Sequence, residues 1–322
     1  MVSSLENFQK ELQVATLRRI HRRDFLKTAG PAVIAAKELA RPTPAWNSAP
    51  NAEPQTEGKP RLLTGCCAYS YAKLLKTGKM TMEDVIRKAV ELGIDAVDMT
   101  GYWFKSSEPA YLASLRHLAH KNGVCFSGAA TGASTVQADA AKRAQVLEEI
   151  KKWTDVTEAL GAPHLRVFAG KLPPGATVQQ GVQWTVETLK AACDYAGKKG
   201  ITLGVENHEG ITQNADVCSE LVHRIDSPYF GINLDITNFV ATPQADAYAQ
   251  IEATLPYATH SHIRDVFENG QAVDLDRVWP LFARANYKGF MSAEYEGEED
   301  PSTGVPKLVE KIKTLCRKYS SV

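Results

Sequence analysis

A repeated pattern in the second half of this chain constrains its fold more than any other feature. Four apolar runs, at residues 203–208, 231–235, 258–262 and 290–294, each finish with a side chain that can bind a metal. These side chains are Glu206, Asp235, His262 and Glu294, and 29, 27 and 32 residues separate them in turn. Each interval matches one strand, one helix and two loops, about 30 residues in a βαβ unit. The pattern predicts that the four groups lie at the same end of four successive parallel strands.

The residues from 61 onward alternate between strand-like and helix-like segments. Predicted strands cover 61–68, 94–99, 124–129, 164–169, 203–208, 231–235, 258–262 and 289–294. Predicted helices cover 81–92, 108–122, 139–160, 177–199, 214–225, 244–255, 274–286 and 305–319. This alternation favours a parallel α/β fold. We therefore predict a single-domain (β/α)8 TIM barrel over residues 61–322, which is a usual length for that fold. An open doubly wound sheet is the alternative, but side chains from four successive strands converge on one centre only if the sheet closes.

The first 60 residues differ from the rest of the chain. Residues 21–27, His-Arg-Arg-Asp-Phe-Leu-Lys, resemble the twin-arginine export signal, with His21 where Ser or Thr is usual. The mildly apolar residues 28–36 are too few to span a membrane. Residues 41–60 carry five prolines, which indicates an extended linker. We thus expect residues 1–40 to direct export to the periplasm, with a cytoplasmic extension as the alternative.

Composition and charge narrow the range of partners. Lys plus Arg and Asp plus Glu are both 37, so no global charge attracts nucleic acid or an anionic membrane surface. We expect a small-molecule partner and no stable membrane insertion, and the sequence leaves homo-oligomerisation open. The six cysteines form no C-x-x-C pair, which argues against a zinc ribbon or a disulfide scaffold. Cys66 and Cys67 end the first predicted strand, where a thiol can line a pocket. No Gly-rich phosphate-binding motif follows a predicted strand, which disfavours a dinucleotide site.

The four repeated side chains form an oxygen-rich donor set with a single nitrogen. Such a set suits one divalent ion, with Mn²⁺ favoured and Mg²⁺, Co²⁺ or Zn²⁺ as alternatives. A lone glutamate at a strand end is more often a helix cap or an ion-pair partner. Four such groups in register are what indicate a metal site.

Four short motifs carry a resemblance to a known family. They are Val205-Glu206-Asn207-His208, Asn233-Leu234-Asp235, His260-Ser261-His262-Ile263-Arg264-Asp265 and Ala293-Glu294-Tyr295. In order and spacing, over about residues 61–319, they resemble the site segments of the xylose-isomerase-like barrels, often called sugar phosphate isomerases/epimerases. The resemblance implies that Glu206, Asp235, His262 and Glu294 bind one divalent metal. It favours His262 over His260, because the family's histidine precedes an apolar residue, a basic residue and an aspartate.

The expected activity is a metal-dependent carbohydrate isomerase or epimerase. Glu206 and Glu294 would act as the general base and general acid at a carbon next to a carbonyl, through an enediolate. Asn238 stands three residues after Asp235, where ketose 3-epimerases look to carry a histidine. A dehydratase or a C-glycoside lyase on the same scaffold therefore stays an alternative, as does a non-catalytic carbohydrate-binding barrel. The neutral charge and only 8 histidines disfavour a nuclease similar to endonuclease IV.

Several further side chains are candidates for contacting a carbohydrate substrate. Each has a plainer alternative: a structural imidazole for His208, a salt bridge on the barrel rim for Arg166, and aromatic rim packing for Trp103. His260 points to the same strand face as His262, so it is either a support for a ligand or part of the pocket wall. The candidates are His208, Arg166, Asn238, His260, Arg264 and Trp103.

Overall fold

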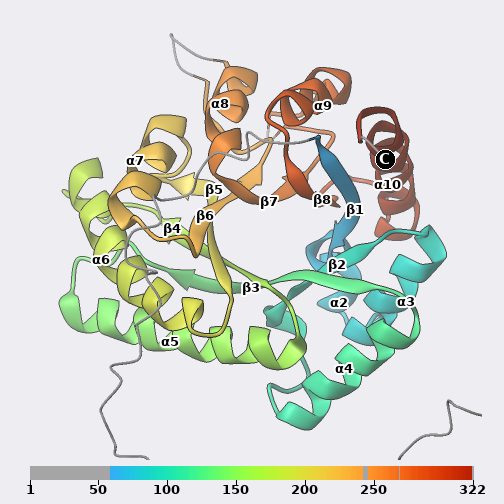
Figure 1. The fold of residues 1–322 in the computed structure, drawn as a ribbon, viewed down its shortest axis with the longest axis horizontal. Coiled ribbons are helices and arrows are strands. Elements are labelled where there is room, and N and C mark those ends of the chain that lie inside the picture. Colours follow the sequence, from blue (N-terminus) through green and yellow to red (C-terminus); the bar gives the residue numbers. More distant parts are fainter. Residues whose placement is uncertain (1–58, 242–245, 268, 321–322) are drawn as a thin grey trace, which may run out of the picture. The chain divides into compact units, whose positions relative to one another are not determined.

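Eight parallel strands form a closed barrel in the computed structural model, which describes residues 59–241, 246–267 and 269–320 (Figure 1). Each strand pairs with its neighbours in sequence, and β1 pairs with β8 to close the ring. The predicted (β/α)8 TIM barrel is thereby confirmed. The strands are β1 Arg61–Cys67, β2 Ala96–Thr100, β3 Cys125–Ser134, β4 His164–Gly170, β5 Thr202–Gly210, β6 Phe230–Asp235, β7 Ala258–Ile263 and β8 Lys288–Ala293.

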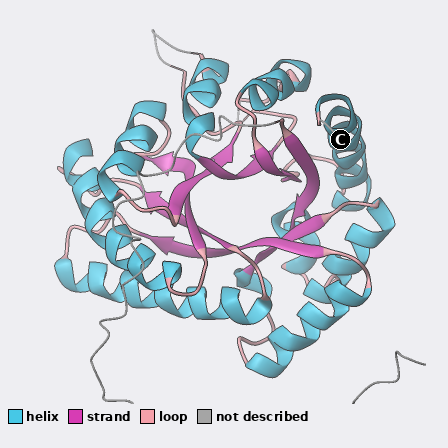
Figure 2. Cartoon of the chain, in the orientation of Figure 1, coloured by secondary structure: helices cyan, strands magenta, loops and turns pink. Residues whose placement is uncertain are grey.

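Helices surround the ring of strands, as Figure 2 shows. Short helical turns follow two of the strands and precede a third: η2 Ala68–Tyr71 and α2 Ala72–Leu75 come after β1, η3 Gly101–Trp103 after β2, and η4 Leu255–Tyr257 before β7. The long helices are α3 Met82–Leu92, α4 Pro109–Lys121, α5 Ala140–Leu160, α6 Val178–Gly197, α7 Ala215–Ile225, α8 Ala247–Thr254, α9 Leu275–Arg284 and α10 Pro301–Tyr319.

Local sequence signals explain where the helices begin and end. Thr81 and Asp84 form a reciprocal capping box at the start of α3, and Gly93 ends that helix in the left-handed conformation. α10 begins four residues before the predicted position 305, because Pro301 suits the first turn and the Asp300 side chain accepts a hydrogen bond from the Ser302 amide. β3 extends to Ser134 rather than to 129, because its small residues continue to pair with β4.

The interior of the barrel is polar towards its centre. The Ser292 hydroxyl on β8 contacts the Asp98 carboxylate on β2, and the rings of His164 on β4 and His260 on β7 stack with their centroids 5.1 Å apart. Strands β2, β4, β7 and β8 are not all neighbours, so their side chains meet inside the ring. Large apolar side chains such as Trp279 instead fill the layer between strands and helices. Titratable and hydrogen-bonding side chains therefore lie inside the barrel.

The predicted export signal and most of the linker, at residues 1–58, lie outside the described residues. Among the residues that are described, no helix combines the length and the apolar character needed to cross a bilayer.

Candidate active site and metal centre

The four repeated side chains meet at one end of the barrel. One donor atom from each of Glu206, Asp235, His262 and Glu294 lies within 4.8 Å of the others. They come from β5, β6, β7 and the position directly after β8, and all four residues are at most 6% exposed. His262 Nδ1 lies 3.2 Å from Glu206 Oε1 and 3.3 Å from Glu294 Oε2. The cluster is compact and shielded from solvent.

An amide bridge holds the ends of β5 and β6 together. The Asn207 side chain donates from Nδ2 to the Asp235 carbonyl and accepts at Oδ1 from the Asp235 amide, each over 2.8 Å. The Thr212 hydroxyl donates to the Glu206 carbonyl over 3.0 Å, which fixes the chain after β5. Because Asn207 lies between Glu206 and His208 in sequence, this bridge sets Glu206 beside Asp235.

The two carboxylate oxygens of Asp235 have different surroundings. Oδ1 accepts hydrogen bonds from the Thr237 amide and hydroxyl, over 2.6 and 2.7 Å. Oδ2 has no hydrogen-bond partner in the described part of the chain, and its nearest cationic group is Arg264 Nη1 at 3.8 Å. Burial, together with the negative charges of Glu294 and Glu206, raises the pKa of the Asp235 carboxyl to about 8. A buried carboxylate oxygen without a hydrogen-bond partner among the described residues suits a cation ligand.

The pKa values of Glu294 and His262 also depend on the charges within and around the cluster. Burial acts to raise the pKa of Glu294, but His262 and Arg166 outweigh it and hold that pKa at about 2. Burial acts to lower the pKa of His262, but Glu294 and Glu206 raise it well above the usual range. Three buried carboxylates with one imidazole fit a divalent cation, since oxygen-rich sites with few nitrogens favour such ions. The residues present therefore fit the expected metal.

Arg166 is an ion-pair partner of this cluster. Its Nε lies 3.1 Å from Glu206 Oε2, with both side chains at most 5% exposed. Its Nη1 donates to the Thr131 carbonyl over 3.2 Å and to the Tyr102 hydroxyl over 3.4 Å, and the guanidinium lies 3.9 Å from the centre of the Phe168 ring. Arg166 is therefore held inside the barrel by a buried salt bridge to Glu206.

A family model described as the xylose isomerase-like TIM barrel matches residues 86–315. The chain belongs to the xylose isomerase-like TIM barrel family. Comparison with proteins of curated function gives no match.

Solved structures from several organisms share this fold. D-allulose 3-epimerase from Methylomonas sp. is 18% identical with a TM-score of 0.63, over 82% of this chain and 100% of that one. 3-keto-D-glucoside 4-epimerase from E. coli is 14% identical with a TM-score of 0.64, over 80% and 100%. The probable 3-DHS dehydratase from Bacillus anthracis is 15% identical with a TM-score of 0.63, over 79% and 98%. At these identities the likeness is one of fold.

In this member of the family, Arg264 and Asn238 lie beside Asp235. Arg264 Nη1 donates to Asn238 Oδ1 over 3.3 Å, and Arg264 Nη2 donates to Glu296 over 2.5 Å. Asn238 is buried, and its Nδ2 has no hydrogen-bond partner among the described residues. The Asn238 amide thus bonds the same arginine that lies 3.8 Å from Asp235 Oδ2.

His208 and Trp103 lie near Arg166 rather than among the donors. The His208 ring packs against Phe168, 4.7 Å between centroids, and its Nδ1 is buried with no hydrogen-bond partner in the described ranges. The Trp103 ring lies 5.7 Å from both Tyr69 and Tyr102. Since the Tyr102 hydroxyl accepts from Arg166, this aromatic group flanks the Arg166–Glu206 pair.

His260 lies deeper in the barrel. Its ring stacks on His164 and meets the His262 ring edge-on at 5.8 Å. Burial lowers the pKa of His260 to about 4, so its ring is neutral at pH 7. Neither ring nitrogen has a hydrogen-bond partner in the part of the chain that the structure describes. His260 therefore lies behind His262.

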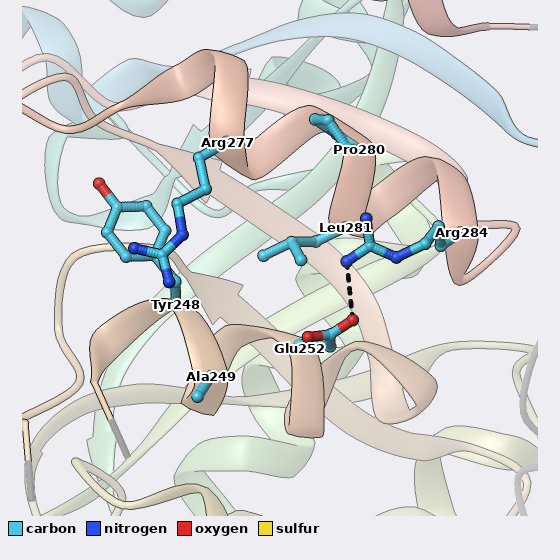
Figure 3. A pocket seen from close by; sticks show the side chains of 7 residues that line it. All are labelled: Tyr248, Ala249, Glu252, Arg277, Pro280, Leu281 and Arg284. Carbon is cyan, nitrogen blue, oxygen red and sulfur yellow. Dashed lines mark hydrogen bonds and ion pairs between the residues drawn. The ribbon is translucent and has the colours of Figure 1, made fainter.

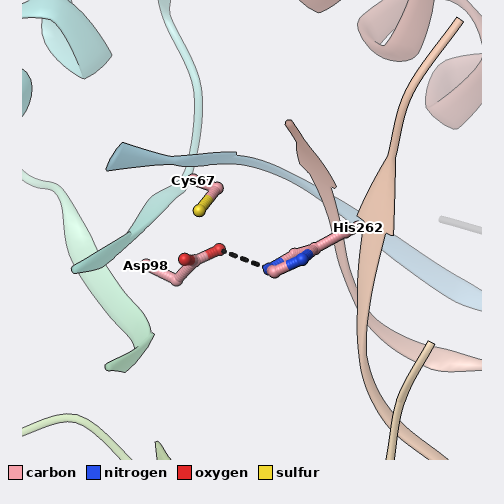
Figure 4. Close-up of side chains that lie close together, drawn as sticks. All are labelled: Cys67, Asp98 and His262. Carbon is pink, nitrogen blue, oxygen red and sulfur yellow. Dashed lines mark ion pairs between the residues drawn. The ribbon is translucent and has the colours of Figure 1, made fainter. Parts of the chain in front are cut away.

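Sequence reasoning missed two residues that support the cluster. Asp98 on β2 lies with its Oδ2 3.6 Å from His262 Nε2, and the Ser292 hydroxyl donates to that same oxygen over 2.7 Å. Figure 4 shows the Asp98 carboxylate directed towards the His262 ring, with the Cys67 thiol on the other side of Asp98 from that ring. The available signal was a single acidic residue in the middle of β2, a strand buried along its whole length.

A separate pocket of about 360 Å³ lies between α8 and α9 on the outer layer (Figure 3). Arg277 stacks over the Tyr248 ring at 4.0 Å and pairs with Asp246, and Arg284 pairs with Glu252 at 2.8 Å. Both guanidinium groups are occupied by neighbouring side chains. The pocket contains none of the four metal-capable donors.

Proposed function

We propose that this chain is a divalent-metal-dependent carbohydrate isomerase or epimerase that removes a proton from a carbon next to a carbonyl. The observation that carries this proposal is the placement of Glu206 and Glu294. Both carboxylates contact His262 Nδ1, yet β6 and β7 separate the strands that carry them. They thus approach a shared centre from different sides, as a proton-abstracting base and a proton-returning acid require.

The residues that would hold the ion are Glu206, Asp235, His262 and Glu294. A bound divalent ion would supply Lewis acidity that stabilises the negative charge of an enediolate. Arg166 fixes Glu206 by their ion pair, and Asn207 fixes the backbone beside it. Glu206 and Glu294 would accept the proton and return it to the opposite face or to the neighbouring carbon. Return to the opposite face epimerises the substrate, and return to the neighbouring carbon isomerises it.

The substrate-contact roles proposed for the surrounding residues follow from their positions. The Asn238 amide hydrogens and the His208 Nδ1 have no hydrogen-bond partner among the described residues and suit sugar hydroxyls, and the aromatic group at Trp103 suits the apolar face of a sugar ring. Arg264 would orient Asn238 through their hydrogen bond. His260 would line the floor of the site behind His262.

A second candidate function is elimination, as in a dehydratase or a C-glycoside lyase. Asn238 favours it, since it replaces the histidine that the ketose 3-epimerase pattern places there. A dehydratase is also among the proteins with a similar fold. The same enediolate would then lose a leaving group in place of regaining a proton. Products distinguish the two reactions: epimerisation preserves the substrate mass, whereas dehydration removes one water.

Deuterium exchange tests the proposal directly. The protein is incubated in D₂O with Mn²⁺ and a panel of unphosphorylated ketoses and keto-glycosides, and deuterium at carbon is read by NMR and mass spectrometry. We expect exchange by the wild type and a loss of about 10²–10⁴-fold in Glu206→Gln and in Glu294→Gln, the usual contribution of a general acid or base. Glu209→Gln is the matched control, because Glu209 is on the same strand but pairs with exposed Lys171.

Two outcomes would contradict the proposal. Full exchange by both glutamine variants would show that neither carboxylate carries the proton. Sugar binding by the wild type without any exchange, with Mn²⁺ bound, would instead identify a non-catalytic carbohydrate-binding barrel.

A further inference from the structure

The two nitrogens of the His262 ring face different groups. Nδ1 faces Glu206 and Glu294 at 3.2 and 3.3 Å, within the cluster that fits a cation. Nε2 faces Asp98 Oδ2 at 3.6 Å on the other side of the ring (Figure 4). Asp98 is 3% exposed and is not one of the four clustered donors. The ring therefore lies between the cluster and a fourth buried carboxylate, that of Asp98.

A neutral imidazole binds a metal through the nitrogen that carries no proton, and the other nitrogen then needs an acceptor for its N–H. Asp98 Oδ2 is such an acceptor, although 3.6 Å is slightly longer than a hydrogen bond. The Ser292 hydroxyl anchors this oxygen over 2.7 Å, so its position does not depend on His262. His260 Nε2 lies 4.0 Å from the same oxygen, beyond hydrogen-bond distance.

We infer that Asp98 is a positioning residue, which keeps the proton of His262 on Nε2 and so leaves Nδ1 available to the divalent ion. This inference rests on the metal site of the proposed function. It assigns Asp98 no contact with substrate and no part in proton transfer to carbon. Ser292 is the residue that holds Asp98 in place.

A second ion bound by Cys67, Asp98 and His262 is the competing interpretation, because donor atoms of these three also lie within 4.8 Å of one another. That ion would have to share the His262 imidazole with the first ion. It would also require Cys67 to lose its proton beside Asp98. A buried, serine-anchored carboxylate facing one ring nitrogen is explained more simply by the orientation of the ring.

The test measures Mn²⁺ binding to the full chain by calorimetry in Asp98→Asn, Ser292→Ala and the control Asp95→Asn. The asparagine amide can donate to Nε2 and so favours the proton on Nδ1, which blocks the metal. We expect Asp98→Asn to weaken Mn²⁺ binding by about 10–100-fold, the usual effect of losing such a partner. Ser292→Ala should weaken it less. Asp95→Asn should bind as the wild type does, because Asp95 contacts Thr64 away from the cluster.

A second measurement reads the proton position itself. In Mg²⁺-loaded wild type, nitrogen-15 NMR of the histidine side chains should show His262 protonated at Nε2, and Ser292→Ala should reduce that population. This readout keeps the inference testable if Asp98→Asn does not fold, which circular dichroism would reveal.

Each outcome decides something distinct. Wild-type Mn²⁺ affinity in a folded Asp98→Asn variant, or a His262 proton on Nδ1 in the loaded wild type, overturns the role of Asp98 but leaves the metal site intact. Two equivalents of Mn²⁺ in the wild type and one in Asp98→Asn would make Asp98 a ligand and overturn the inference. No Mn²⁺ binding by the wild type overturns both the inference and the proposed metal dependence.

Discussion

The contact between Arg166 and Glu206 is an ion pair that water does not reach. A buried pair of this kind contributes little net stability, but removing one partner leaves the other charge stranded in a medium of low dielectric constant. Glu206 already shares its surroundings with Asp235 and Glu294. The positive charge of Arg166 therefore matters most when no cation occupies the cluster.

We predict that Arg166→Met lowers the free energy of unfolding by about 3–5 kcal/mol in the presence of EDTA, because it strands the Glu206 carboxylate. Urea denaturation measures this. Lys171→Met is the control: its pair with Glu209 is exposed, and such pairs contribute less than about 1 kcal/mol. Equal destabilisation by the two substitutions would mean that Arg166 does not balance the charge of Glu206.

At the residue scale, the sequence predicted the clustered donors but not their supports. Glu206, Asp235, His262 and Glu294 stand at strand ends in a regular period, so the fold alone brings them together. Asp98 and Ser292 are 194 positions apart in the chain, and no local pattern relates them. Their contact depends on which residues of β2 and β8 face each other inside the closed barrel, and sequence spacing does not encode that.

At the scale of elements, β5 passes close to β4 where it approaches the cluster. A Cβ atom on Gly204 would lie 2.3 Å from His164 Nε2, so only glycine fits there without moving the ring. Gly204 is two residues before Glu206 and therefore faces the same side of the strand. The position of Glu206 thus depends on the close packing of Gly204 against the His164 ring.

We predict that Gly204→Ala lowers the free energy of unfolding by about 1–3 kcal/mol, the usual cost of overpacking, and also weakens Mn²⁺ binding. Thermal unfolding and calorimetry measure the two effects. Thr202→Ala on the same strand is the control, since Thr202 is only partly buried and its effect should stay within about 0.5 kcal/mol. Unchanged Mn²⁺ affinity in Gly204→Ala would separate Glu206 from the packing at Gly204.

Element types were predictable, whereas several boundaries and the short turns were not. The long strands and helices follow from alternation and from capping residues such as Thr81 and Asp300. The turns η2, α2 and η3 have no such signals. They form because the chain packs over the barrel end, where Tyr69 and Trp103 meet.

At the scale of the whole chain, the segment before the barrel carries a separate proposal. We propose that residues 1–40 direct export through a twin-arginine route, which would deliver a folded protein with its metal already bound. We predict that fusing residues 1–60 to a reporter moves it to the periplasm, and that Arg22→Lys with Arg23→Lys abolishes the transfer. Cell fractionation measures this, with Arg18→Lys and Arg19→Lys as the control pair outside the motif. Export that survives loss of Arg22 and Arg23 would reject the proposal.

The four metal-capable donors lie in or directly after β5 to β8, whereas the aromatic side chains and Arg166 come from the first half of the barrel. The loops after β1 to β4 carry none of the four metal-capable donors, so they can change during evolution without altering the donor set. Substitutions in the loops after β1 to β4 would alter what the pocket accepts while leaving the donors untouched. A library confined to those loops should give proteins that keep their Mn²⁺ affinity while their preferred sugars diverge.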